Sequence, residues 1–285
     1  MNETAGGRVW LVTGASSGFG LAIAEAALNA GDTVVAGVRR PAAMDDLAGR
    51  YPGRVTAVEL DVTDGSQVTA AVAQTMLWHG RIDVLVNNAG RGLVGAVEET
   101  TERELRDLMD VHFFGPAALI RAVLPHMRAQ GSGAIVNLTS MGGRFSFAGV
   151  GAYSATKFAL EGLSEALALE IAPFGIKVLI AEPGAFRTGF AGGALRQSSA
   201  LPAYAGITGA VRTDLAASDG SQPGDPGKAA DAILQALDSD KTPLRLVLGN
   251  DAADMIGAYL DDSRTEFSAW EHIARSTDYD ASASS

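Results

Sequence analysis

Short apolar runs alternate with longer segments of helical periodicity along most of the chain. The runs are rich in Val, Ile and Leu and occupy residues 8–14, 33–38, 54–60, 82–90, 133–140, 176–184 and 244–249. Because their hydrophobicity is continuous rather than alternating, they predict strands buried on both faces. Helix-length segments lie between them, at residues 18–30, 64–79, 101–129, 152–173 and 227–239. This order predicts an α/β fold, a doubly wound parallel sheet of about seven strands flanked by helices.

One segment interrupts the alternation. Residues 187–226 are rich in small, polar, Gly and Pro residues and lack a strong periodicity, a composition found in functional lids and in partly disordered loops. The segment follows the carboxyl end of the sixth predicted strand, where open α/β sheets bind ligands, so we expect a lid over a substrate pocket. With no repeat and no linker, residues 1–285 form one predicted domain, and residues 276–285 are expected to be a flexible tail.

Composition narrows the classes of function. The chain has 285 residues, of which 47% are hydrophobic and 19% charged, so it can bury a large core. A net charge of −11 without a basic block disfavours nucleic acid and anionic membranes as partners. The absence of cysteine excludes disulfides, thiolate nucleophiles and Cys-based metal sites. Because we find neither a bilayer-length apolar run nor a signal peptide, we expect a cytoplasmic protein.

The first predicted strand runs directly into a glycine-rich turn, TGASSGFG, at residues 13–20. Gly14, Gly18 and Gly20 permit a tight turn and the close approach of a ligand's phosphates. The helix that follows offers free N–H groups and the positive end of its dipole to such an anion. The spacing differs from the usual G-x-G-x-x-G dinucleotide fingerprint, but the same physical reasons predict a dinucleotide.

About twenty residues after these glycines, a dinucleotide-binding fold recognises the adenosine ribose. An acidic side chain at that point binds the 2′-hydroxyl, whereas an arginine accommodates a 2′-phosphate. This chain has Val38, Arg39 and Arg40 there and no carboxylate. The sequence therefore favours NADP(H) over NAD(H), with Arg39 as the phosphate ligand and Arg40 as a solvated surface charge.

A tyrosine and a lysine stand four residues apart in the predicted helix at 152–173. Residues at this spacing share a helix face, so the Tyr153 hydroxyl and the Lys157 ammonium can reach one small volume. Taken alone, the pair is more simply explained as two surface residues. Other candidates follow the ends of the third, fourth and fifth strands, at the ligand-binding edge of the sheet: Asp61, Val62, NNAG at 87–90, and Ser140.

Taken together, these motifs and PGAFRT at 183–188 resemble the classical short-chain dehydrogenase/reductase family over about residues 8–190. The later DPGKAADAIL and PLRLVLG are similar to the subgroup related to 17β-hydroxysteroid dehydrogenases. The resemblance implies a Rossmann-type fold and an NADP(H)-dependent oxidoreductase that transfers hydride between nicotinamide and a ketone or secondary alcohol. Tyr153 would be the general acid/base, and Ser140 would hold the substrate oxygen. Lys157 would favour the phenolate and bind the nicotinamide ribose.

The same resemblance implies a cofactor site built from the glycine turn, the strand ends and the catalytic helix. Its residues are Gly14, Ser16, Ser17, Gly18, Phe19, Gly20, Arg39, Asp61, Val62, Asn88, Ala89, Gly90, Tyr153, Lys157, Pro183, Gly184, Phe186 and Thr188. PGAFRT would line the carboxamide side of the nicotinamide through backbone groups and Thr188.

One position departs from the family pattern. The family usually has an asparagine in the fourth helix, thought to hold a water that relays protons to the lysine, whereas this chain has His112. His112 is therefore either a substitute in that relay or a buried histidine that satisfies a backbone group. As a relay, it would add an acid-side inflection to the pH–rate profile. His79, His126 and His272 stand apart without ligand-like spacing, so no metal site is expected.

Two other functions share parts of the pattern. Sugar-nucleotide epimerases and dehydratases also use Tyr-x-x-x-Lys, but they usually have T-G-x-x-G-x-x-G and a larger C-terminal substrate domain. A cofactor-binding sensor without turnover is the second alternative. The intact Ser140, Tyr153 and Lys157 argue against the sensor, and His112 argues faintly for it.

The partners implied are a small carbonyl or alcohol substrate and further copies of the chain. Family members are often homodimers or homotetramers formed through the fourth and fifth helices, and residues 158–171 have apolar side chains on more than one face. Tyr259, Phe267 and Trp270 fall in a C-terminal helical pattern, where we expect core or interface residues.

Overall fold

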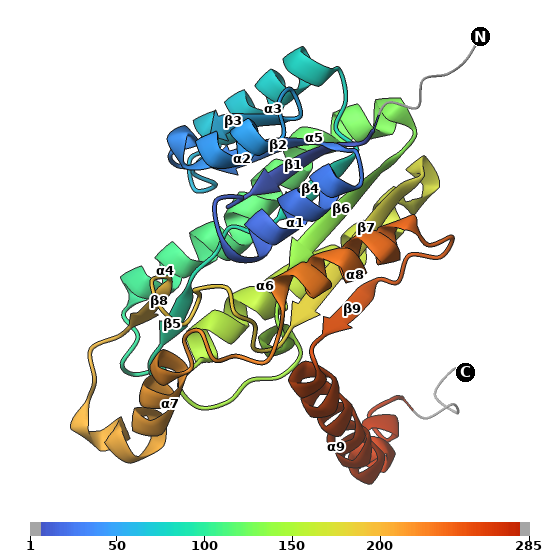
Figure 1. Cartoon of the computed structure of the whole chain (residues 1–285). Coiled ribbons are helices and arrows are strands. Elements are labelled where there is room, and N and C mark those ends of the chain that lie inside the picture. Colours follow the sequence, from blue (N-terminus) through green and yellow to red (C-terminus); the bar gives the residue numbers. More distant parts are fainter. Residues whose placement is uncertain (1–6, 280–285) are drawn as a thin grey trace.

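The structure is a computed structural model that describes residues 7–279. Seven parallel strands form one sheet in the order β3-β2-β1-β4-β6-β7-β9 (Figure 1). The strands are β1 (Val9–Thr13), β2 (Thr33–Val38), β3 (Val55–Glu59), β4 (Val84–Asn87), β6 (Gly133–Leu138), β7 (Ile176–Pro183) and β9 (Arg245–Leu248). Each lies inside one of the seven predicted runs, and the strand order reverses direction between β1 and β4. The predicted doubly wound sheet is confirmed.

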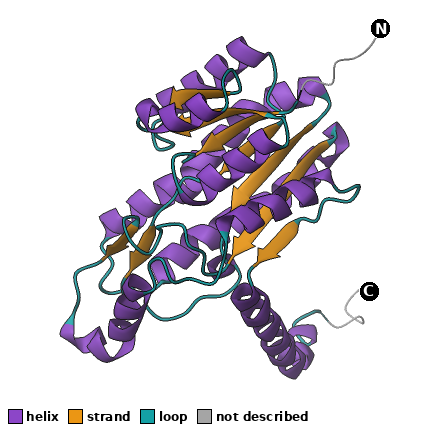
Figure 2. Cartoon of the chain, viewed as in Figure 1, coloured by secondary structure: helices purple, strands orange, loops and turns teal. Residues whose placement is uncertain are grey.

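Helices cover both faces of the sheet (Figure 2). One face packs against α1 (Gly18–Asn29), α2 (Asp45–Arg50) and α8 (Pro226–Asp238). The other face packs against α3 (Gly65–His79), α5 (Gly115–Gln130) and α6 (Gly151–Ile171). The strands between these layers are buried on both faces, which explains their continuous hydrophobicity.

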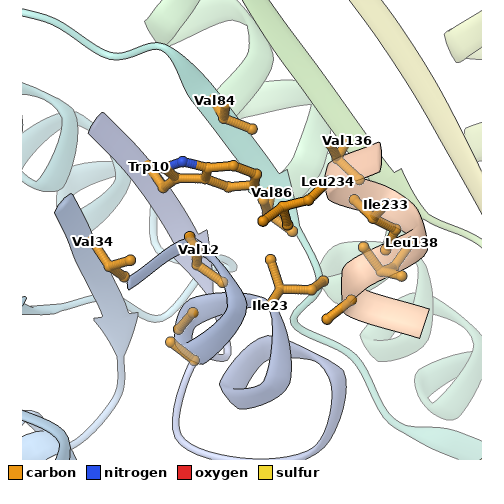
Figure 3. Close-up of a cluster of buried hydrophobic side chains, with 14 of the residues drawn as sticks. Trp10, Val12, Ile23, Val34, Val84, Val86, Val136, Leu138, Ile233 and Leu234 are labelled. Carbon is orange, nitrogen blue, oxygen red and sulfur yellow. The ribbon is translucent and has the colours of Figure 1, made fainter. Parts of the chain in front are cut away.

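The core is divided by the sheet into two clusters. Side chains that alternate along β1 enter different clusters, Trp10 and Val12 on the α1 and α8 side and Val9 and Leu11 on the α3 and α5 side. Figure 3 shows Trp10 among branched aliphatic side chains of the first cluster. The indole N–H of this fully buried residue donates to Asp32 Oδ2 at 2.8 Å, so its polar atom keeps a partner.

The predicted helix at 101–129 is interrupted. It begins as α4 (Glu102–Met109) behind a Thr101–Glu104 capping box, widens into a π-helical turn (Asp110–Phe114), and continues as α5. The π turn carries His112, and such turns often occur at functional sites. Among the described residues, the stretch Glu102–Gln130 has the length and composition of a membrane span, but close to half of its most apolar part is buried inside the fold.

The segment 187–226 is folded. It contains β8 (Leu195–Gln197), which pairs in parallel with the short β5 (Gly92–Val94), and α7 (Ala205–Ala217). These three elements lie together beyond the carboxyl ends of the main strands (Figure 1). The partly disordered alternative is not what the structure shows, because this segment forms strand and helix.

The C-terminal helix α9 (Asn250–Arg275) projects from the body of the molecule (Figure 1). Phe267 and Trp270 are 62% and 65% exposed, so neither is a core residue, and the interface alternative stays a prediction for both. Tyr259 is 39% exposed and packs its ring at 5.8 Å from the ring of Phe145. Of the predicted tail, residues 276–279 follow α9 as exposed backbone turns, and residues 280–285 lie outside the described residues.

Candidate active site

A cavity of about 690 Å³ opens at the carboxyl ends of the strands, beside the point where the strand order reverses. Open α/β sheets bind ligands at such a point. The cavity brings together all of the site residues predicted from the sequence except Gly20. It extends from the glycine turn and Arg39 at one end to Ser140 and Tyr153 at the other.

The glycine turn is shaped to bring backbone close to a ligand. Gly14 and Gly18 have φ of +65° and +55°, a region that side-chain-bearing residues rarely adopt. Gly20 does not line the cavity, and its role is packing, because a Cβ there would lie 2.4 Å from the Gly14 carbonyl oxygen and from Asn88 Nδ2. The turn ends at the N-terminus of α1, where Ser17 occupies the cap position without a side-chain cap bond. These features fit the phosphates of a dinucleotide.

Asn88 braces this turn from the neighbouring strand. Its Nδ2 donates to the carbonyl oxygens of Thr13 at 2.8 Å and Gly14 at 3.3 Å. The Thr13 hydroxyl in turn accepts from the backbone N–H groups of Asn88 and Ala89. The motif NNAG therefore fixes the glycine turn to β4, in addition to lining the cavity.

Three arginines line the same cavity: Arg39 after β2, Arg91 before β5, and Arg196 on β8. None of them makes an ion pair with a carboxylate of residues 7–279. Arg91 Nη2 donates to the Asp107 carbonyl oxygen at 2.9 Å. Burial and the positive charge of Arg196 lower the pKa of Arg91. Sequence reasoning missed Arg91 and Arg196, since neither lies in a motif that the dinucleotide argument uses.

Asp61 lines the cavity but also holds its own turn. Its Oδ1 accepts from the backbone N–H of Thr63 at 3.0 Å and from the Thr63 hydroxyl at 2.7 Å. Asp61 can therefore hold this turn and still contact a cofactor, because its second carboxylate oxygen is not used by Thr63.

Tyr153 lies between the rings of His112 and Phe190, with ring centroids at 5.5 and 5.8 Å. This burial raises the pKa of Tyr153 to about 12, and a hydrogen bond with the Ser140 side chain lowers it by less. The Ser140 hydroxyl also accepts from the Gly142 N–H at 3.1 Å, which fixes its position. Burial thus favours the protonated phenol, an effect opposite in sign to the one expected of the nearby Lys157 ammonium.

Lys157 is buried, and its ammonium donates to the Leu138 carbonyl oxygen at 2.9 Å. Burial lowers the pKa of Lys157 to about 8, and the charge of Glu161 opposes that shift. The Nζ atom is 5.7 Å from the centre of the Tyr153 ring. The expected convergence of the two polar ends on one volume is present, with a carbonyl at the end of β6 as the partner of the ammonium.

Both ring nitrogens of His112 are occupied by protein groups. Nε2 accepts from the Arg91 backbone N–H at 3.1 Å, and Nδ1 lies 2.8 Å from Thr156 Oγ1. Since the Thr156 hydroxyl donates to the Tyr153 carbonyl oxygen at 2.7 Å, it must accept from His112, whose Nδ1 then carries the proton. Burial, together with the charges of Lys157 and Arg91, holds the pKa of His112 well below its usual range.

These contacts correspond to the second interpretation of His112, a buried histidine that satisfies a backbone group. A relay water would have to compete with the Arg91 N–H or the Thr156 hydroxyl for a ring nitrogen. The lowered pKa of His112 argues against an acid-side inflection from this residue, and the pH–rate profile stays the test of that prediction.

The family model described as short chain dehydrogenase matches residues 8–198, most of the chain. The chain belongs to the short-chain dehydrogenase family. An oxidoreductase of Botryotinia fuckeliana, BOA17, is 38% identical over 268 residues, which cover 94% of this chain and 98% of the relative. The narrower likeness to 17β-hydroxysteroid dehydrogenases stays a prediction.

Solved short-chain dehydrogenases have the same fold. A crystal structure from Streptomyces avermitilis is 60% identical, with a TM-score of 0.90 and coverage of 95% of this chain and 100% of that one. One from Burkholderia cenocepacia, in complex with NADP, is 27% identical, with a TM-score of 0.72 and coverage of 92% and 97%. Another relative at 27% identity was solved with NADH. The family and these structures support an oxidoreductase with a nicotinamide cofactor.

The end of the cavity around Tyr153 is apolar in this dehydrogenase. Side chains from four different segments line it: Leu93, Val94, Phe147, Val150, Phe190 and Leu215. Phe190 and Leu215 come from the segment 187–226, so that segment forms part of the cavity wall. Sequence reasoning did not identify these individual residues, because they follow no periodic pattern.

Proposed function

We propose that this short-chain dehydrogenase is an NADPH-dependent ketoreductase with Tyr153 as the general acid. The observation that carries the proposal is one cavity with a glycine turn and unpaired arginines at one end and the Ser140–Tyr153 pair at the other. This arrangement also favours an enzyme over a cofactor-binding sensor, since a sensor has no use for a positioned proton donor.

The residues present fit a nicotinamide dinucleotide. Gly14, Ser16, Ser17 and Gly18 would hold its pyrophosphate, Arg39 its adenosine end, and Pro183 to Thr188 the carboxamide. When bound, the cofactor supplies the hydride that the substrate carbon receives. Gly18 lies against this last segment, because a Cβ at Gly18 would meet Thr188 at 3.0 Å.

The protein's own part in the reaction is to bind the carbonyl oxygen and protonate it. Ser140 is held by Gly142 N–H and directs its hydroxyl hydrogen toward the cavity or the Pro183 carbonyl oxygen, 3.5 Å away. Tyr153, whose pKa is raised to about 12, keeps its proton at neutral pH and gives it to the oxygen as negative charge develops there. A positive charge on Lys157 then stabilises the resulting phenolate.

The preference for NADPH rests on Arg39, and Arg91 and Arg196 support it. In a chain of net charge −11, three arginines that line one cavity and pair with no carboxylate among residues 7–279 indicate an anionic ligand. A 2′-phosphate adds two negative charges that a 2′-hydroxyl lacks. Arg196 belongs to the segment 187–226, so this contact would also draw the proposed lid toward the cofactor.

The substrate side predicts an apolar ketone. Leu93, Phe147, Val150, Phe190 and Leu215 offer hydrocarbon, and hydrogen bonding is concentrated at Ser140 and Tyr153. We therefore expect ketones with alkyl or aryl substituents to be better substrates than charged keto acids. The cytoplasmic location and the role of residues 187–226 as a lid that opens and closes remain predictions.

The test is a panel of carbonyl compounds incubated with the protein and NADPH, read by loss of nicotinamide absorbance. We expect turnover of apolar ketones, a smaller rate with NADH, and little turnover of keto acids of similar size. Lack of turnover across the panel, in protein shown to bind NADPH, would contradict the ketoreductase and favour the sensor.

A further inference from the structure

A cluster of buried charges lies behind Lys157, between α6, the carboxyl end of β7 and the start of β9. Its centre is Glu161 on α6 and Glu182 on β7, whose side chains are 6% and 0% exposed. Arg245 on β9 and Arg144 beyond the short helical turn after Ser140 supply the positive charges, with 25% and 21% of their side chains exposed. None of these residues was singled out by the sequence, and the proposed reaction does not use them directly.

The two carboxylates converge on one N–H group. Arg245 Nε lies 3.0 Å from Glu161 Oε2 and 3.2 Å from Glu182 Oε1. A guanidinium Nε carries a single hydrogen, so it cannot satisfy both oxygens at once. Glu182 Oε1 has a second donor, Arg144 Nη1, at 3.1 Å. Among the described residues, the remaining oxygens, Glu161 Oε1 and Glu182 Oε2, are buried without a hydrogen-bond partner.

Two buried carboxylates this close to the same atom cannot both ionise without repulsion, and a proton on one of them relieves it. Glu182 has two arginine partners, Arg144 and Arg245. Glu161 shares its single arginine contact and is the one to take the proton. In agreement, burial raises the pKa of Glu161 to about 7, and the charge of Glu182 adds to that effect, while the Thr139 side chain and Arg245 oppose it.

Glu161 is coupled to Lys157 by position. It lies one helical turn after Lys157 on the same face of α6. Both side chains pack on Gly143, where a Cβ would lie 3.0 Å from Glu161 Cγ and 3.4 Å from Lys157 Cβ. Glu161 is also the carboxylate that raises the pKa of Lys157 against the effect of burial. The charge on Glu161 therefore bears directly on the charge of the lysine.

We propose that Glu161 is a positioning residue with a switchable charge, protonated beside Glu182 in mildly acidic solution and ionised above neutrality, where it keeps Lys157 charged. The groups that face it are Lys157 and Glu165 on α6, Glu182 on β7, Arg245 on β9 and Arg144. The effect of Glu161 on catalysis rests on the proposed function, because there Lys157 must stay positive to stabilise the Tyr153 phenolate. Its protonation behaviour does not depend on that function.

The first experiment measures thermal unfolding from pH 4.5 to 8 for the parent protein, Glu161→Gln and Glu165→Gln. Glu165 contacts the same arginine, Arg245, but is more than half exposed, so its variant is the matched control. The folded-state pKa of Glu161 lies above its ordinary value of 4.5, so the folded protein binds the extra proton and loses stability as pH rises from 4.5 to 7. Glutamine mimics the protonated state and escapes this loss.

We therefore expect the Tm of Glu161→Gln, relative to the parent, to rise by a few degrees between pH 4.5 and 7 and to level off above it. The relative Tm of Glu165→Gln should stay constant. A constant or falling difference for Glu161→Gln would overturn the proposal, since it would mean that Glu161 is ionised throughout as an ordinary partner of Arg245.

The second experiment follows the pH dependence of ketone reduction and of NADPH binding. Without the carboxylate, Lys157 loses its proton more easily, so both profiles of Glu161→Gln should fall off at a pH lower by about one unit, while Glu165→Gln keeps the parent profile. An unchanged alkaline limb would overturn the link to Lys157. If no ketone is turned over, the ketoreductase fails, and the unfolding and NADPH-binding measurements still decide the role of Glu161.

Discussion

Burial sets the protonation states of the side chains around the cavity. It raises the pKa of Tyr153 to about 12 and lowers that of Lys157 to about 8, so the phenol holds a proton and the lysine lies close to losing one. In each case desolvation of the charged form is the largest cause. A phenol that holds its proton is the form that the proposed ketone reduction needs.

Arg39 gives the sharpest residue-scale prediction on the cofactor. A charge-assisted bond to phosphate contributes roughly 1.5–3 kcal/mol. Arg39→Ala should therefore weaken NADPH binding at least ~tenfold and barely change NADH binding. Titration of both cofactors against both proteins checks this, and Arg40→Ala is the control, since Arg40 does not line the cavity. Equal losses for the two cofactors would place the 2′-phosphate elsewhere.

The contacts of His112 lead to a prediction about stability as well as rate. His112→Ala leaves the Arg91 N–H without its partner and removes the donor to the Thr156 hydroxyl oxygen, which costs about 1–3 kcal/mol. Asparagine can both accept and donate, so His112→Asn should recover part of the Tm and keep activity within about tenfold. Thermal unfolding and pH–rate profiles check both variants.

Because the imidazole of His112 is already neutral, neither substitution should remove an inflection on the acid side of the pH–rate profile. A His112→Ala protein with the parent's Tm and activity would show that these hydrogen bonds do not hold the site. An inflection present only in the parent would return His112 to the proton relay.

At the scale of elements, Glu99 fastens the segment 187–226 to the body of the molecule. Its buried carboxylate accepts from the backbone N–H groups of Ala96 and Leu201, and from Arg212 of α7 at 2.7 Å. The Ala96 and Leu201 hydrogen bonds, with help from Arg212, lower the pKa of Glu99 to about 2. One carboxylate thus joins the loop after β5 at Ala96, the segment 187–226 at Leu201, and α7 at Arg212.

Because an ionised Glu99 makes these contacts, we expect the attachment of the segment 187–226 to weaken in acid. The folded-state pKa of Glu99 lies below its ordinary value of 4.5, so its contribution is present above that pH and is lost as pH falls toward 2. Glu99→Gln should speed hydrogen exchange in α7 at pH 7, and the difference from the parent should shrink below about pH 4. Glu98→Gln, which removes an exposed partner of Tyr204, is the control. Equal exchange in Glu99→Gln and the parent at pH 7 would contradict this role.

The sequence predicted the strands and helices whose hydrophobic pattern reflects burial. It did not predict features that depend on local backbone geometry or on packing between elements. All seven main strands follow from continuous hydrophobicity, and part of the cavity lining follows from glycine spacing, strand ends and the family resemblance, whereas Arg91, Arg196 and the apolar wall do not. The π turn around His112 could not be predicted, because widening a helix by one residue leaves the hydrophobic period almost unchanged. The contact between Glu161 and Glu182 could not be predicted either, since a residue of α6 and a residue of β7 meet only through the packing of that helix on the sheet.

At the scale of the whole molecule, apolar side chains remain on the outside of α6 and α9. Leu169 is 80% exposed and Phe158 44%, on the helix through which family members commonly associate. We expect a solution mass of two or four times 29.3 kDa by light scattering. Leu169→Asp should yield monomers, since burying a carboxylate in such an interface is costly. A parent protein that is already monomeric at micromolar concentration would contradict this expectation.

The central claim, that Tyr153 protonates the substrate oxygen, is tested most directly by Tyr153→Phe. The substitution removes one hydroxyl and keeps the ring that packs between His112 and Phe190. Proton transfer by a positioned side chain typically accelerates a reaction ~10²–10⁴-fold, so kcat for ketone reduction should fall by that factor while Tm and NADPH affinity stay close to the parent's. Turnover within about threefold of the parent, on a substrate that the parent reduces, would contradict the account.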